Sequence, residues 1–183
     1  MPKVRPSCFV LMPFGKRKDP ARPRKGEIDF DRIYKLAIET GASKAGLQPV
    51  RADEETVGGI IHKPMLERLL LSDFAVADLT LPNPNVYYEL GVRHSARQNT
   101  TLLIHASHVR LPFDVAPVRA LPYEIGSDNK VSKKQLEALS DAIAKYGLTT
   151  TQQVGARLRA GTNCGSCLPE IRALLAKPTA AAV

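Results

Sequence analysis

The sequence of 183 residues has no tryptophan, few aromatic residues (5%) and only three cysteines. Three cysteines cannot form the disulfide framework that stabilises small secreted domains, and an odd number fits a reducing compartment better. No stretch approaches the roughly 18 uninterrupted apolar residues of a membrane-spanning helix. The first residues also lack the apolar segment of a secretory signal. We therefore expect a cytoplasmic protein that makes no membrane contact.

Acidic residues are also too few to balance the basic ones, because 26 Lys and Arg face 18 Asp and Glu and give a net charge of +8. Residues 16–25 hold six bases and one acid, and thus +5 of that charge. This run has no aromatic side chain for stacking on bases, so we do not expect general binding to nucleic acid. Its prolines and charges predict a loop. Two interpretations stay open for it: a solvated, mobile loop, or a cationic rim that attracts phosphate-bearing ligands.

Short apolar runs alternate with segments of helical periodicity along the first two thirds of the chain. The pattern predicts strands over residues 7–12, 47–50, 74–78, 101–104 and 120–125, and helices over 29–45, 60–71, 85–98 and about 136–147. Such alternation is typical of an α/β sandwich in which helices cover both faces of a parallel sheet of about five strands. We place this α/β domain at residues 1–126, a connecting helix at 127–147 and a small helical appendage at 148–183.

Two carboxylates are the first candidates for catalysis. Asp78 ends a predicted strand, and ligands of doubly wound sheets bind outside the carboxyl ends of the strands. Glu89 follows in the next helix, whose N-terminal dipole would favour an ionised carboxylate. An ionised carboxylate that faces a cleft suits a nucleophile in retaining glycosyl transfer. The alternative is that Glu89 is solvent-exposed and Asp78 caps the helix. Of Tyr87 and Tyr88, one must face the core, and the other could line a pocket.

Further candidate ligand-binding residues follow the first three strands at the same edge of the sheet. Gly15 permits close approach of backbone to a ligand, although a simple turn explains it equally well. Arg51 is structural if it pairs with a carboxylate and could bind phosphate if it is free. The candidate set is Pro13, Phe14, Gly15, Arg51, Asn83 and Asn85.

Several segments resemble the TIR-like and nucleoside 2-deoxyribosyltransferase-like superfamily. These are residues 12–15 (MPFG), 77–80 (ADLT) and 83–91 (NPNVYYELG). Residues 51–55, 58–62 and 111–114 are similar to a bacterial subgroup related to the TIR-like segment before the TRAF-binding region of apoptosis signal-regulating kinases. The resemblance spans roughly residues 7–125 and implies a flavodoxin-like, three-layer sandwich.

The resemblance implies two functions. The first is a TIR-like module that binds a nucleotide-type ligand or acts in signalling by assembly with itself or with a protein partner. The second is an N-glycosidase acting on NAD or a nucleoside, in which Glu89 attacks the sugar and Asp78 or Tyr88 orients it. The transferases carry an aspartate six residues before their glutamate, where this chain has Asn83, and the kinase-linked relatives are scaffolds. Whether the chain is an enzyme stays open at this point.

A third function is suggested by Cys164 and Cys167, since a Cys-x-x-Cys pair suits a metal, an iron–sulfur cluster or a redox disulfide. Residues 154–175 resemble the end of a bacterioferritin-associated-ferredoxin-like [2Fe–2S] domain, a form found at the C-terminus of assimilatory nitrate reductases. The first Cys-x-Cys pair of that family, some thirty residues upstream, is absent, and no cysteine lies between Cys8 and Cys164. We therefore do not expect a complete cluster within one chain. Free thiols, a redox disulfide and a cluster bridging a dimer stay open.

Overall fold

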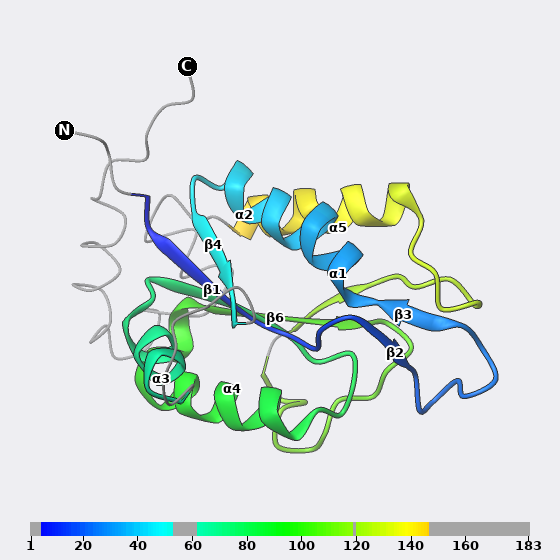
Figure 1. Cartoon of the computed structure of the whole chain (residues 1–183), viewed down its shortest axis with the longest axis horizontal. Helices are drawn as coiled ribbons and strands as arrows, with labels where there is room; N and C mark the ends of the chain where they lie inside the picture. The colour runs from blue at the N-terminus through cyan, green and yellow to red at the C-terminus, as the bar shows by residue number, and fades with distance from the viewer. Residues whose placement is uncertain (1–4, 53–61, 119, 147–183) are drawn as a thin grey trace.

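The computed structural model describes residues 5–52, 62–118 and 120–146, which form a three-layer α/β sandwich (Figure 1). Its central sheet contains β1 (Ser7–Leu11), β4 (Gln48–Arg51), β5 (Phe74–Asp78), β6 (Thr101–Ala106) and β7 (Ala120–Tyr123). The strands are ordered β4-β1-β5-β6-β7, and every neighbouring pair is parallel. This is the flavodoxin-like order of a doubly wound sheet. The predicted fold class is confirmed.

Helices cover both faces of the sheet, as Figure 1 shows. One face is covered by α1 (Phe30–Ile33), the π-helical turn η1 (Tyr34–Ile38), α2 (Glu39–Lys44) and α5 (Lys133–Tyr146). The other is covered by α3 (His62–Leu71) and α4 (Pro84–Arg97), after which the 3₁₀ turn η3 (Gln98–Thr100) leads into β6. Successive side chains of β1 enter opposite cores, because a strand alternates its side chains between the two faces of a sheet. Val10 lies in one buried cluster, and Phe9 and Leu11 lie in the other.

The beginning of α4 shows how local sequence sets an element boundary. Asn83 is the N-cap, and its side-chain oxygen accepts a hydrogen bond from the Asn85 backbone N–H at 3.0 Å. Pro84 occupies the first helical turn, where its missing N–H would have had no helical partner. This Asn-Pro-Asn segment thus sets the start of α4.

The cationic run is less loop-like than its composition predicts. Strand β2 (Lys16–Lys18) pairs antiparallel with β3 (Glu27–Asp29), so that Lys16 lies opposite Asp29 and Lys18 opposite Glu27. Opposite charges across a strand pair are favourable, and Ile28 is completely buried beneath the hairpin. Residues 16–18 are therefore a strand, and the prediction of a loop is wrong for them, although all three side chains are exposed.

Helix α5 belongs to the same layer of the sandwich as α1 and α2. Its side chains Leu136, Leu139 and Ile143 are at most 4% exposed and belong to the same buried cluster as α1 and α2. Among the helices of the described ranges, none has both the length and the apolarity to cross a bilayer. The predicted appendage at 148–183 lies outside the described residues.

Candidate functional site

Asp78 ends β5 at the carboxyl edge of the sheet, but its side chain is completely buried. Its Oδ1 accepts a hydrogen bond from the Thr80 backbone N–H, and its Oδ2 accepts one from the Tyr123 hydroxyl, both at 2.9 Å. The Thr80 hydroxyl lies 2.8 Å from the Tyr123 hydroxyl and accepts a hydrogen bond from the Ala106 backbone N–H. Burial raises the pKa of Asp78, and these hydrogen bonds offset part of that rise. Asp78 was expected to face an open crevice, and its complete burial does not agree with that expectation. A catalytic role for Asp78 stays a prediction.

This network joins three neighbouring strands. Asp78 comes from β5, Tyr123 from β7, and the backbone of Ala106 from the end of β6. Because Tyr123 donates to the carboxylate, the Thr80 hydroxyl is left to donate to Tyr123. Sequence reasoning missed both Thr80 and Tyr123. Thr80 stands in the segment 77–80, but no role was assigned to it, and Tyr123 belongs to no motif and meets Asp78 only through the pairing of β5, β6 and β7.

Glu89 lies half-buried on α4. Within the described residues, its carboxylate makes no hydrogen bond or ion pair. Burial raises its pKa from 4.5 to about 7. Burial therefore opposes the ionised form that the helix dipole was expected to favour. The dipole acts mainly within the first turn, and Glu89 is the sixth residue of α4. Beside it, Tyr88 is 63% exposed, whereas Tyr87 packs against the core.

The structure brings Phe14, Gly15 and Arg51 together around Asp31. Asp31 Oδ1 accepts hydrogen bonds from the Gly15 backbone N–H at 3.1 Å and from Arg51 Nη1 at 2.7 Å. These two donors hold the pKa of Asp31 below its usual value. The Arg51 guanidinium also lies over the rings of Tyr34 and Phe14, at 4.5 and 5.3 Å from their centroids. Arg51 is thus paired with a carboxylate, the condition under which the sequence favoured a structural role.

The other predicted ligand-binding residues have local roles or no described partner. Gly15 adopts a left-handed φ of 67°, which glycine tolerates and other residues rarely do. Pro13 precedes this turn, Asn83 caps α4, and Asn85 is exposed on the first turn of that helix. Their predicted contacts with a ligand stay predictions.

The predicted metal-ligand pair, Cys164 and Cys167, lies outside the described residues. The third cysteine, Cys8, is on β1 and is 1% exposed, and burial raises the pKa of its thiol to about 12. A thiol with such a pKa is a poor metal ligand, because metals bind the thiolate. Within the described ranges, no group of three or more His, Cys, Asp or Glu is placed to hold a metal ion.

Residues 129–132 precede α5 and contact both the β2–β3 hairpin and α1. Ser132 and Gln135 form a reciprocal capping box at the start of α5, with hydrogen bonds of 2.7 and 3.3 Å. The Val131 carbonyl accepts a hydrogen bond from Arg32 Nη1 at 2.7 Å, and the Asn129 amide donates to the Gly26 carbonyl at 2.8 Å. These contacts integrate residues 129–132 into the α/β domain.

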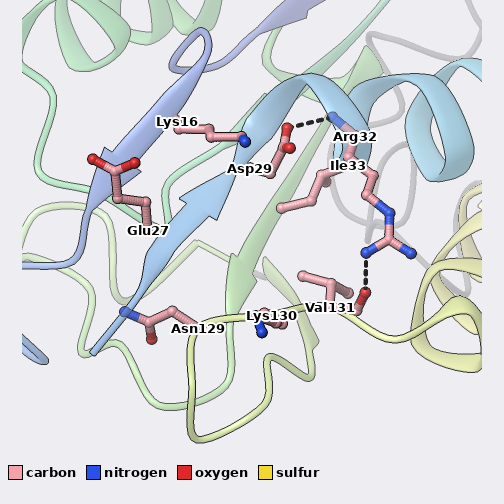
Figure 2. A pocket seen from close by; sticks show the side chains of 8 residues that line it. All are labelled: Lys16, Glu27, Asp29, Arg32, Ile33, Asn129, Lys130 and Val131. Carbon is pink, nitrogen blue, oxygen red and sulfur yellow. Dashed lines mark hydrogen bonds between the residues drawn. The ribbon is translucent and has the colours of Figure 1, made fainter.

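A cavity of about 330 Å³ lies between the hairpin, α1 and the segment before α5 (Figure 2). It is lined by Lys16, Glu27, Asp29, Arg32, Ile33, Asn129, Lys130 and Val131. None of these residues was predicted as a site residue. The cationic run was the only sequence signal near the cavity, since the other walls come from segments about a hundred residues apart.

Comparison with known proteins finds similarity in the C-terminal part of the chain. The family model of the BFD-like [2Fe–2S] binding domain matches residues 129–177. A nitrate reductase of Klebsiella oxytoca is 51% identical over 45 residues, which make up 25% of this chain and 5% of that protein. The chain therefore spans only a small part of that relative.

These matches correct two interpretations of the sequence. The family model describes a BFD-like [2Fe–2S] binding domain, and neither match lends support to the TIR-like and deoxyribosyltransferase-like identification. That identification is wrong, as is the N-glycosidase activity inferred from it. The ferredoxin-like similarity is also longer than the expected tail, because it begins at residue 129 and includes α5. The chain is thus similar to a [2Fe–2S] binding domain over a segment whose first third forms part of the α/β sandwich.

Proposed function

We propose that this protein is a redox protein and that Cys164 and Cys167 carry this function. The observation that supports the proposal is the match to a [2Fe–2S] binding domain over residues 129–177, which contains both cysteines. A Cys-x-x-Cys pair is also an arrangement in which thiol pKa values fall and thiolates become reactive.

The number of sulfur donors limits what one chain can bind. A [2Fe–2S] cluster of this type needs four cysteine thiolates. The described part of the matched segment, residues 129–146, contains no cysteine or histidine, and the Cys8 thiol is buried in the sheet. One chain thus supplies two thiolates, so a complete cluster does not fit within it.

Two thiols do complete a dithiol–disulfide couple. Oxidation forms the bond between the Cys164 and Cys167 sulfurs and releases two protons and two electrons. A disulfide of a partner molecule accepts them and becomes two thiols. This couple is the redox form that the single chain can support, and it is our primary proposal.

A second candidate is a [2Fe–2S] cluster shared by two copies of the chain, each providing Cys164 and Cys167. The family match favours this candidate, because binding such a cluster is the property by which that family is described. It requires a dimer, whereas the dithiol couple does not.

The test uses the full chain purified without oxygen, with iron and inorganic sulfide measured per chain. For the dithiol couple we expect no iron, a loss of two hydrogens in the intact mass after treatment with oxidised glutathione, and loss of this change in Cys164→Ser and Cys167→Ser. Cys8→Ala is the control, and it should behave as the wild type. One iron and one sulfide per chain in a dimer would favour the shared cluster. Absence of both the metal and the reversible mass change would refute a redox function.

A further inference from the structure

We propose that the cavity between the hairpin, α1 and residues 129–131 binds a phosphorylated sugar or a similar phosphorylated polyol. This site is separate from the cysteine pair and independent of the proposed redox function. The inference rests on the charges that line the cavity, on how firmly its walls are held, and on its size.

Three cations line the cavity. Lys16 extends from β2 toward Asp29 (Figure 2), and its ammonium group makes no hydrogen bond or salt bridge within the described part of the chain. Arg32 uses Nη1 to bind the Val131 carbonyl. Lys130 is 80% exposed and lies 3.8 Å from a carboxylate oxygen of Asp128. A phosphate is the group that such a set of cations binds most directly.

Two carboxylates in the same lining define the rest of the ligand. Asp29 uses Oδ1 to accept a hydrogen bond from the Arg32 backbone N–H at 3.0 Å, and Glu27 is exposed on the same hairpin strand. Both would repel a bare phosphate, but both are good acceptors for hydroxyl groups. A ligand that carries both an anion and hydroxyl donors can satisfy both kinds of charged group in the lining.

Asn129 adds an unsatisfied acceptor at the cavity. It is 1% exposed, and its Nδ2 donates to the Gly26 carbonyl, but its Oδ1 is buried without a partner among the described residues. A buried acceptor without a donor is unfavourable. Because this oxygen is closed to solvent, it does not contact a ligand in the cavity, and the part of Asn129 in the site is to hold residues 129–131 against the hairpin through its hydrogen bond to Gly26.

The hairpin wall is fixed without a ligand. Asp19, the one acid of the run 16–25, is 2% exposed and lies 2.8 Å from His108 Nε2. Arg22 Nη1 donates to the Gly126 carbonyl at 3.1 Å. Burial of Asp19 beside His108 leaves the outer surface of residues 16–25 with exposed cations and no exposed acid. Fixed walls also reduce the entropy that binding would have to remove.

The volume limits the ligand. About 330 Å³ lies at the small end of the range of roughly 300–1,000 Å³ for small-molecule sites. This space accommodates a pentose phosphate and excludes a folded nucleic acid, which could touch only the rim.

The test measures binding to the full chain by isothermal titration calorimetry with ribose 5-phosphate, inorganic phosphate and ribose. We expect ribose 5-phosphate to bind at least about tenfold more tightly than phosphate, and ribose to give no saturable heat. Lys16→Met and Lys130→Met should each weaken ribose 5-phosphate binding about fivefold or more. Lys133→Met is the matched control, because Lys133 is an 86% exposed lysine outside the lining.

Asp29→Asn distinguishes recognition of the phosphate from recognition of the hydroxyl groups. Asparagine still caps α1 but carries no charge, so we expect phosphate to bind more tightly and the advantage of ribose 5-phosphate to shrink. Absence of binding to the wild-type chain would overturn the proposal. Equal affinity for phosphate and ribose 5-phosphate would overturn the polyol class. Equal weakening by Lys133→Met would show attraction by net charge instead of a site.

Discussion

The packing of α5 against α2 can be tested by the same substitution at two glycines. Gly41 lies in α2, and a Cβ added there would be 2.6 Å from the Ser140 carbonyl oxygen and 2.8 Å from the Ile143 Cβ. Both atoms belong to α5 and neither is the end of a flexible side chain, so the helices must move apart. Gly91 lies on the exposed face of α4, and a Cβ there meets nothing within 4 Å.

The two alanine variants should change stability in opposite directions. Replacing a helical glycine by alanine stabilises by about 1 kcal/mol where there is space, so we expect Gly91→Ala to raise the free energy of unfolding by that amount. At Gly41 the same gain is opposed by overpacking, which costs about 1–3 kcal/mol and more where backbone must shift. With two contacts below 3 Å, we expect Gly41→Ala to lower the free energy of unfolding by about 1–2 kcal/mol.

The assay is equilibrium unfolding in urea followed by far-ultraviolet circular dichroism, with thermal melting as a second measurement. The two variants should differ by about 2–3 kcal/mol, or about 4–12 °C in Tm for a chain of this length. If Gly41→Ala were stabilising to the same degree as Gly91→Ala, α5 would not be packed on α2. Residues 129–146 would then not be a layer of the sandwich, and the reasoning would be refuted.

Two further predictions concern buried polar groups. Tyr123→Phe removes the donor to Asp78 Oδ2 and the acceptor of the Thr80 hydroxyl, so we expect the free energy of unfolding to fall by about 2–3 kcal/mol. The exposed Tyr88→Phe should change it by less than about 0.5 kcal/mol, and equal effects would contradict the network. Glu89 binds its proton more tightly in the folded state, so wild-type stability should fall as pH rises from 4.5 to about 7. Glu89→Gln should remove this fall, and parallel stability curves of variant and wild type between pH 4 and pH 8 would contradict it.

Residues 129–146 are both part of the family match and part of the α/β domain. By sequence they are the first part of the ferredoxin-like match, and by structure they include a helix of the α/β domain. The family's first cysteine pair, some thirty residues before its Cys-x-x-Cys, is absent from this chain, and Val131 and Ser132 lie in that region. In this chain Val131 is 5% exposed and bound to Arg32, and Ser132 caps α5.

The sites were less predictable than the fold. Asp78 and Glu89 were predicted as site residues because carboxylates near strand ends often face ligands. Asp78 is instead buried in a hydrogen-bond network, and burial raises the pKa of Glu89. The cationic run was visible in the sequence. Its partners in the cavity, Asn129 and Lys130, follow more than a hundred residues later, and no local pattern marks them.

The sequence by itself determined the alternation of strands and helices, the parallel sheet and the cap of α4, because these depend on periodicity and on neighbouring residues. It also determined that one chain has two cysteines to offer as a pair, since that is a matter of counting. Only the tertiary structure decided that Asp78 is buried, that Arg51 is paired, that Asp19 is withdrawn from the cationic surface and that α5 closes the sandwich. Each of these depends on contacts between residues 20 to about 100 positions apart, and local sequence carries no information about which distant side chain will supply them.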